Sequence, residues 1–190
     1  MSGGPLPAKI AFVGLPGAGK SSIGRRLAGR LGLPFGDLDE AIEARLGCSV
    51  REYFERDGEP AFRDLEARTL VQLAASTELV LATGGGAVLR ADNRTLLRDH
   101  FHVIYLRASP EDLMRRLRHD IKRPLLQVAD PLERLRELHG QRDALYAKTA
   151  HSVVGTGRAS LSRMVATIIE TLERDAVPPA PGGPGLSAKG

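Results

Sequence analysis

The sequence predicts an α/β protein in which a mostly parallel β-sheet is covered by helices on both faces. Two observations support this prediction. Short apolar runs alternate with longer amphipathic segments along the chain, and such alternation requires right-handed crossovers between parallel strands. The first apolar run is also followed directly by a glycine-rich turn and a helical pattern, an arrangement that suits anion binding at a helix N-terminus.

Each expected element follows from its apolar spacing. The expected strands are short apolar runs at 10–13, 34–38, 79–83, 103–106 and 152–154, of which 34–38 is the weakest. The expected helices lie at 20–31, 39–46, 50–56, 59–75, 90–99, 110–117, 131–148 and 160–174. Ser49 with Glu52 fits a capping box, and Pro110 stands at a first helical position.

Length and composition indicate one domain. The chain has 190 residues, 42% of them apolar, which is enough for a single core of ordinary size. We expect this domain to cover residues 9–175. Residues 1–8 are expected to be a disordered N-terminus, and the Pro- and Gly-rich segment 176–190 a disordered tail, because it lacks the apolar periodicity that would offset the entropy of ordering.

The charge pattern and the cysteine content indicate the kind of ligand and the cellular compartment. The formal net charge is +4, but basic residues are interspersed with acidic ones, so we expect anionic small molecules rather than nucleic acid. Cys48 is the single cysteine, which excludes an internal disulfide and fits a reducing interior. No leader and no apolar run of membrane-spanning length is evident. We therefore expect a cytoplasmic protein without membrane contact, and a monomer by default.

The strongest local signal is a phosphate-binding P-loop. Residues 14–21 read Gly-x4-Gly-Lys-Ser directly after a strand. The glycines allow backbone N–H groups to surround an anion, the next helix adds its positive dipole end, and Lys20 adds a full charge. Ser21 is placed to hold a magnesium ion.

Two carboxylates, Asp37 and Asp39, follow the weak second strand at the edge of the sheet that carries the P-loop. On an extended segment they would point to opposite sides, so that one can face a metal and the other a substrate. Capping of the following helix by Asp39 is an equally good interpretation from spacing alone.

Three further features are ambiguous by themselves. The glycines at 84–86 follow the third strand and leave bare backbone for a flat polar ligand, but they also fit a flexible turn. Arg63 with Glu66 fits a substrate-binding arginine or, more often, a surface ion pair, and Arg142 has the same ambiguity.

The densest basic stretch lies between two helices. It comprises Arg115, Arg116, Arg118, Lys122 and Arg123. A loop of this kind, at about 119–129, suits closing over phosphates as a mobile lid, although a solvated loop is the alternative. The five histidines show no metal-ligand spacing, and we assign them no role.

Taken in order, these segments resemble the shikimate kinases, a family of P-loop kinases related to the nucleoside monophosphate kinases. The resemblance runs from about residue 9 to 174. Its motifs are the P-loop, Asp37-Leu38-Asp39 with Ile42-Glu43, Asp57-Gly58-Glu59 leading to Phe62-Arg63-Asp64-Leu65-Glu66, Gly84-Gly85-Gly86-Ala87, Arg123-Pro124-Leu125-Leu126, and Arg142. Leu38, bulkier than expected between the aspartates, and the Pro-Gly tail depart from the family pattern.

The resemblance implies a three-layer α/β/α P-loop kinase fold with a five-stranded parallel sheet in the order 2-3-1-4-5 and a mobile lid. It also implies transfer of the γ-phosphate of ATP to the 3-hydroxyl of shikimate, with Mg²⁺, in aromatic amino-acid biosynthesis. The substrate-binding region would be about 37–66. The alternatives are another small-polyol kinase, such as gluconate kinase, and a non-catalytic ATP-sensing module.

The resemblance also implies roles for individual residues. Shikimate would be bound by Asp39, Arg63, Gly85 and Arg142. The two arginines would bind its carboxylate, and Asp39 would be the base for the attacking hydroxyl. Catalysis would further need Lys20 and Arg123 at the phosphates, and the metal would be held by Ser21 and Asp37. The nucleotide would contact Gly17, Ala18, Gly19, Lys20, Ser21, Ser22, Arg116 and Arg123.

Overall fold

A five-stranded parallel sheet in the order β2-β3-β1-β4-β5 forms the centre of the computed structural model, which describes residues 5–117, 128–157 and 159–176. The strands are β1 (Lys9–Val13), β2 (Phe35–Asp37), β3 (Leu79–Ala82), β4 (His102–Arg107) and β5 (Ser152–Gly155). The implied strand order is therefore confirmed, and each strand lies within two residues of its expected bounds.

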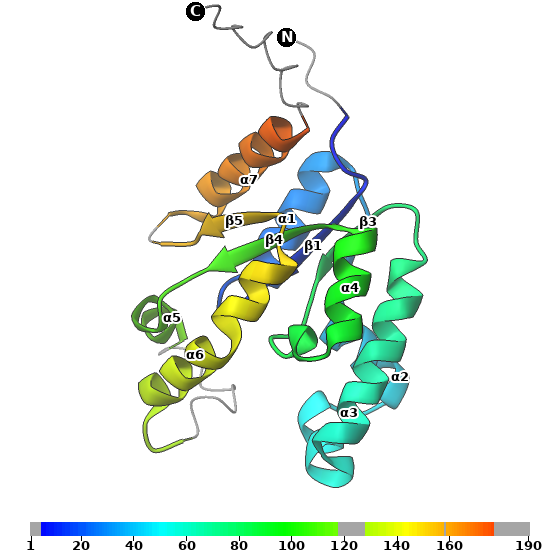
Figure 1. Ribbon diagram of the computed structural model, residues 1–190, viewed down its shortest axis with the longest axis vertical. Helices are drawn as coiled ribbons and strands as arrows, with labels where there is room; N and C mark the ends of the chain where they lie inside the picture. The colour runs from blue at the N-terminus through cyan, green and yellow to red at the C-terminus, as the bar shows by residue number, and fades with distance from the viewer. Residues whose placement is uncertain (1–4, 118–127, 158, 177–190) are drawn as a thin grey trace, which may run out of the picture.

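Helices cover both faces of the sheet (Figure 1). They are α1 (Lys20–Leu31), α2 (Leu38–Leu46), α3 (Val50–Ala74), the 3-10 turn η1 (Ala87–Leu89), α4 (Ala91–His100), α5 (Pro110–Leu117), α6 (Pro131–Thr149) and α7 (Leu161–Asp175). On one side α1 packs against α7, and on the other α4 contacts α3 and α6. The fold is thus the expected three-layer arrangement.

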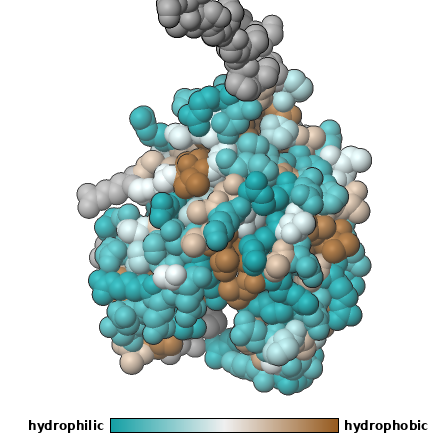
Figure 2. Space-filling model, viewed as in Figure 1, coloured by the Kyte–Doolittle hydropathy of each residue, from teal (hydrophilic) through white to brown (hydrophobic). Residues whose placement is uncertain are grey.

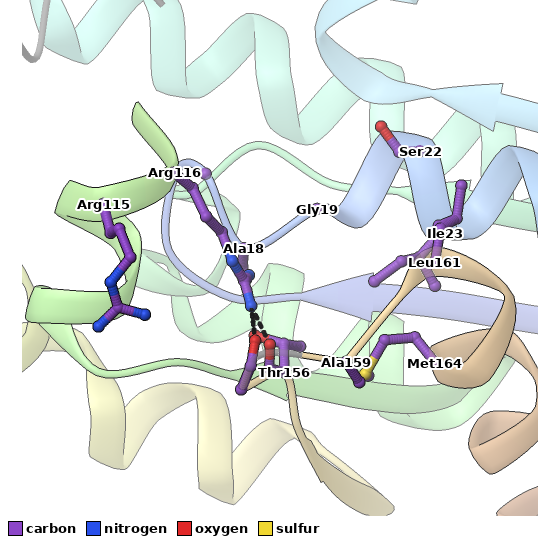
Figure 3. A pocket seen from close by; sticks show the side chains of 12 residues that line it. Ala18, Gly19, Ser22, Ile23, Arg115, Arg116, Thr156, Ala159, Leu161 and Met164 are labelled. Atoms are coloured by element: carbon purple, nitrogen blue, oxygen red, sulfur yellow. Dashed lines mark hydrogen bonds between the residues drawn. The ribbon is translucent and has the colours of Figure 1, made fainter. Parts of the chain in front are cut away.

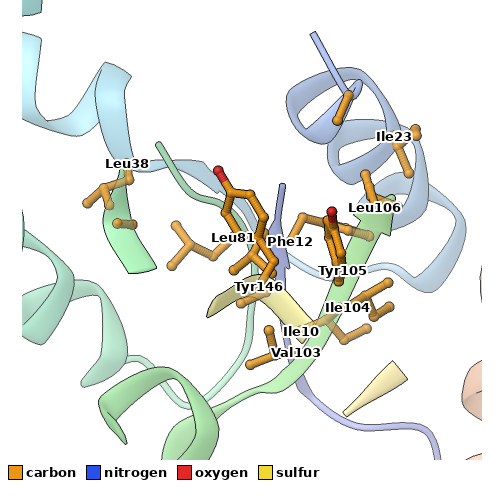
Figure 4. Close-up of a cluster of buried hydrophobic side chains, with 14 of the residues drawn as sticks. Ile10, Phe12, Ile23, Leu38, Leu81, Val103, Ile104, Tyr105, Leu106 and Tyr146 are labelled. Carbon is orange, nitrogen blue, oxygen red and sulfur yellow. The ribbon is translucent and has the colours of Figure 1, made fainter. Parts of the chain in front are cut away.

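The core is the inner part of the sheet. Ile10 to Val13 of β1 are fully buried, because β1 lies between β3 and β4 and beneath helices on both faces. Figure 4 shows side chains of β1, β3 and β4 gathered with Tyr146 of α6. This packing fixes the carboxyl ends of β1, β2 and β3 at one edge of the sheet, where ligands of such folds bind.

Helix α3 contains the two helices expected at 50–56 and 59–75, joined across a break in helical geometry. It runs through both segments with a sharp kink, at which Gly58 has φ 82° and ψ 171°, followed by Pro60. Glycine adopts this left-handed backbone without a Cβ clash, and proline has no N–H to continue the helical ladder. The helical backbone is therefore interrupted at Gly58, in the gap that the sequence pattern predicts between the two helices.

The expected N-terminal boundary also needs a correction. Residues 5–8 were expected to be disordered, yet Leu6 packs against the core and the Ala8 carbonyl accepts a hydrogen bond of 2.9 Å from Leu79 N. The apolar Leu6 explains the difference. Residues 1–4, 118–127, 158 and 177–190 lie outside the described residues, and so does most of the lid expected at about 119–129.

The face seen in Figure 2 is predominantly hydrophilic, with small apolar spots, and a notch opens between the side formed by α6 and the side formed by α2 and α3. Among the helices described, none has the length and apolar content needed to cross a membrane.

Candidate active site

The P-loop lies between β1 and α1 with its backbone turned as the motif predicts. Gly17 and Gly19 have φ 84° and 93°, which only glycine adopts without strain. Gly19 caps α1 without any side-chain hydrogen bond to the first N–H groups of the helix, so these donors face the loop. Lys20 is only 8% exposed, and its Nζ donates to the carbonyls of Gly14 (2.8 Å) and Leu15 (3.0 Å). The ammonium group is thereby held beside the loop.

Ser21 and Asp37 meet beside the P-loop. Ser21 Oγ donates to Asp37 Oδ2 over 2.6 Å, so the expected metal-binding pair is adjacent. Asp37 Oδ1 also accepts from the N–H groups of Asp39 (3.0 Å) and Glu40 (3.4 Å). The cap of α2 is therefore Asp37, not Asp39. Asp39 lies in the first turn of the helix rather than on an extended segment, which releases its carboxylate from capping.

The triple-glycine turn at 84–86 is needed for space rather than for an unusual backbone, because none of its residues has a positive φ. A Cβ atom at Gly84 would lie 2.8 Å from Asp39 Oδ1. At the second glycine it would lie 2.9 Å from Pro16 of the P-loop, and at the third 2.4 Å from the Arg63 guanidinium. The side chain of Asp39, the P-loop and the guanidinium of Arg63 therefore pack closely against this one turn.

Arg63 is held by a buried ion pair. Its Nη1 donates to Glu66 Oε2 over 2.8 Å, and the two side chains are 15% and 1% exposed. Glu59 adds a second contact of 3.1 Å from the exposed side. The surface-pair interpretation is therefore wrong. Burial raises the pKa of the Glu66 carboxyl, although Arg63 acts in the opposite direction, and Glu66 Oε1 has no hydrogen-bond partner among the residues that the structure describes.

Arg142 reaches the same turn from α6. Its Nη1 donates to the Gly85 carbonyl over 3.1 Å. Its Nε is buried and finds no partner within the described part of the chain. An unpaired buried N–H is costly, so a hydrogen-bond acceptor placed against this donor would be stabilising. The expected substrate set, Asp39, Arg63, Gly85 and Arg142, is thus gathered at one place from α2, α3, the turn after β3, and α6.

Asp39 has a perturbed carboxyl group. Burial, and then the nearby charge of Asp37, raise its pKa above the ordinary value of 3.8, while Lys20 and Arg63 lower it. The net effect is a higher pKa. A carboxylate with this environment holds a proton more readily than a solvated aspartate does.

A separate cavity of about 440 Å³ opens on the other side of the P-loop (Figure 3). Arg116 lies at its wall, where its Nη1 donates to Thr156 Oγ1 over 3.1 Å and its Nη2 to the Thr156 carbonyl. Ile23, Leu161 and Met164 form an apolar side opposite Arg115. Of the expected nucleotide residues, this cavity contains Gly17, Ala18, Gly19, Ser22 and Arg116.

Sequence reasoning missed several residues of both regions. Thr156, Leu161 and Met164 follow β5, whose carboxyl end lies at the P-loop edge, so the strand order would have indicated them. Glu66 was noticed only as a partner for Arg63, because its burial is not encoded in the local pattern. Arg123 and the expected lid at 119–129 fall largely outside the described residues, and no position is assigned to Arg123 here.

Comparison with known proteins identifies the family. The family model for shikimate kinase matches residues 16–173. The chain belongs to the shikimate kinase family. A shikimate kinase of Paracidovorax citrulli is 51% identical over 176 residues, covering 90% of this chain and 96% of its own.

Solved structures of shikimate kinases share the fold. The shikimate kinase from Acinetobacter baumannii, solved in complex with shikimate, superposes with a TM-score of 0.83 at 38% identity over 88% of this chain and 94% of its own. A gluconokinase from Sinorhizobium meliloti superposes with a TM-score of 0.60 at 21% identity over 90% of this chain and 94% of its own, a likeness that concerns the fold alone. The resemblance to shikimate kinases is confirmed, and the chain is an ATP-dependent kinase.

Proposed function

We propose that this chain transfers the γ-phosphate of ATP to the 3-hydroxyl of shikimate, with acceptor and nucleotide bound on either side of the P-loop. One observation carries the assignment of the acceptor side. Asp39, Arg63 and Arg142 converge on the triple-glycine turn, which itself touches the P-loop through Gly85 and Pro16. An acceptor held there lies beside the groups that bind phosphate.

Arg63 and Arg142 bind the carboxylate of the acceptor. Guanidinium groups match a carboxylate with two parallel donors, and both arginines are largely shielded from water. The unpaired Nε of Arg142 is a donor that a carboxylate oxygen would satisfy. Arg63 keeps its orientation through Glu66. The cost of burying these charges is then offset when the anionic substrate binds.

Asp39 accepts hydrogen bonds from ring hydroxyls and takes the proton of the attacking one. Its carboxylate lies against Gly84, at the turn where the arginines converge. Its raised pKa suits this step, because a stronger base accepts the hydroxyl proton more readily. The proton moves from the 3-hydroxyl oxygen to a carboxylate oxygen of Asp39. At the same time the 3-hydroxyl oxygen forms its bond to the γ-phosphorus, and the bond between that phosphorus and the ADP oxygen breaks.

Lys20 and the N–H groups of the loop neutralise the transferring phosphoryl group. Phosphoryl transfer depends mainly on positioning and on charge stabilisation. Lys20 is buried and fixed by two backbone carbonyls, so it is preorganised for this purpose. We assign Arg123 the same task from the lid, as the family motif implies.

Ser21 and Asp37 fit a magnesium ion. Both offer hard oxygen donors 2.6 Å apart, and Mg²⁺ binds through one or two protein oxygens together with phosphates and water. The nucleotide phosphates and water would complete the coordination. When bound, the ion supplies positive charge at the phosphates.

The cavity beside Arg116 binds the adenine end of ATP. Its apolar side formed by Ile23, Leu161 and Met164 suits a flat base, and the guanidinium of Arg116 is held against Thr156 at the wall. Arginine packs well on an aromatic face.

We also propose that the protein acts as a cytoplasmic monomer, which gel filtration and cell fractionation would check.

One assay tests the function. ADP release is measured with ATP and Mg²⁺ alone, with shikimate, and with gluconate. We expect release only with shikimate, and the product to carry phosphate on the 3-hydroxyl by NMR. Turnover with gluconate would favour a different polyol kinase. ATP binding without turnover of either compound would favour a sensing module.

A further inference from the structure

The carbonyl of Gly85 has two donors, and only one of them belongs to the expected substrate site. Tyr146 OH donates to it over 2.5 Å, and Arg142 Nη1 donates over 3.1 Å. Tyr146 lies one helical turn after Arg142 on α6, so both side chains leave the same face of the helix. Helix α6 therefore holds the middle of the triple-glycine turn at two points.

Tyr146 is itself rigidly placed. It is fully buried, and its ring lies 5.1 Å from that of Tyr105 at an angle of 34°. Figure 4 shows it among side chains of the sheet, near Leu81. Burial raises the pKa of the hydroxyl to about 12, so it stays protonated and remains a donor at physiological pH. The ring thus belongs to the core, whereas the hydroxyl reaches the acceptor site.

The Tyr146 hydroxyl sets the orientation of the Gly85 peptide group. A glycine turn has no local preference strong enough to set the direction of its peptide groups. The peptide bonds are not cis, so the Gly85 carbonyl and the Gly86 N–H point in opposite directions. When the Gly85 carbonyl points toward α6, the N–H of Gly86 points away from α6. Gly86 is the residue that packs against Arg63.

We propose that Tyr146 is a positioning residue for the acceptor, which orients the Gly85 peptide and, through the shared carbonyl, the guanidinium of Arg142. This inference rests on the proposed acceptor site. Tyr146 does not touch the reacting atoms. Its effect is to hold the backbone donor and the arginine in the geometry that binds the acid-bearing substrate, so its loss should weaken binding of shikimate and leave ATP binding unchanged.

The test removes one oxygen atom. Tyr146→Phe keeps the ring and its packing, while the Gly85 carbonyl keeps only Arg142 and the hydroxyl's own interaction with the Arg142 side chain is lost. Loss of one buried hydrogen bond corresponds to about a tenfold rise in the KM and Kd for shikimate, with the KM for ATP changed by less than about twofold.

Tyr105→Phe is the matched control. It deletes the hydroxyl of the neighbouring tyrosine, which donates to Asp143 over 2.8 Å and not to the turn. Asp143 keeps its contact of 2.7 Å with Arg107, so α6 stays attached to β4. The KM for shikimate should stay within about twofold of the wild-type value in this variant, because its lost bond lies outside the acceptor site.

The outcomes separate the inference from the site on which it rests. An unchanged shikimate KM in Tyr146→Phe, together with a raised one in Arg142→Lys, would overturn the positioning role alone. An unchanged shikimate KM in Arg142→Lys would overturn the acceptor site and the inference with it. Equal rises in the KM for shikimate and for ATP, with a lower Tm than in Tyr105→Phe, would show that the hydroxyl serves folding only.

Discussion

The two sides of the P-loop are built in different ways. On the acceptor side, charged side chains from three helices are buried around a turn of bare backbone, with Arg63 and Glu66 only 15% and 1% exposed. On the nucleotide side, backbone N–H groups and an apolar wall line a cavity of about 440 Å³, with Arg116 at its edge. If the proposed sites are right, a particular acid is recognised by desolvated charges, whereas a phosphate chain common to many ligands is bound mainly by backbone donors.

We expect the largest effect from a change in the P-loop, which lies between the acceptor side and the nucleotide side. Lys20→Met removes the ammonium group that is held beside the loop and should lower kcat on the order of 10⁴-fold, because charge neutralisation dominates phosphoryl transfer. Rapid-quench kinetics at saturating ATP and shikimate would measure it. Lys148→Met, at an exposed position near the end of α6, is the control. A loss below tenfold would mean that backbone donors alone suffice.

The next test concerns the perturbed carboxyl of the acceptor side. Asp39→Asn should lower kcat/KM for shikimate by about 10³-fold, because the base is lost. In the wild-type enzyme, activity should fall at acid pH with a midpoint above the ordinary aspartate value of 3.8, since the pKa of Asp39 is raised and the base must be unprotonated. Rate profiles from pH 4 to 9 would check this.

Asp39→Asn should raise the stability of the protein although it lowers the activity. Because folding raises the pKa of Asp39, this group contributes its full share to the free energy of unfolding only below its unfolded pKa. That contribution is lost as the pH rises through the pKa of the folded protein. At neutral pH the charged Asp39 thus opposes folding. We expect Asp39→Asn to have a higher Tm than the wild type at pH 7 and the advantage to shrink toward pH 4. Glu40→Gln, an exposed neighbour, should show neither effect.

The third test separates binding from folding on the acceptor side. Arg63→Ala should raise the KM for shikimate by about 10²-fold and destabilise the protein by about 3 kcal/mol, because Glu66 is left charged and buried. Adding Glu66→Gln should restore much of the stability but not the KM. Arg90→Ala breaks an exposed pair with Asp64 and serves as the control. Urea denaturation and steady-state kinetics would give both quantities.

The smallest effect is expected at the nucleotide side. Arg116→Ala should raise the KM for ATP about fivefold, as for the loss of one stacking contact, with the KM for shikimate unchanged. Arg134→Ala, at a surface pair with Glu137, should leave both constants unchanged. A larger effect on shikimate than on ATP would contradict the separation between the two sides.

The sequence predicted the elements more closely than the contacts between them. Helices α1 and α5 begin and end where the apolar spacing and a first-turn proline indicated. The break in α3 at Gly58 lies in the gap that the sequence pattern left between two helices, because Gly58 and Pro60 are local signals. Capping of α2 by Asp39 was left open as an alternative because spacing does not distinguish Asp39 from Asp37, which is the cap.

By itself, the sequence determined the P-loop and the alternation that produces a parallel sheet, since both depend on residues close together in the chain. Only the tertiary structure decided that Arg63 is buried with Glu66, that three glycines are needed for space, and that Tyr146 reaches Gly85. These properties depend on groups as many as 61 residues apart. Their proximity follows from the packing of α3 and α6 around the sheet, and no local pattern encodes it.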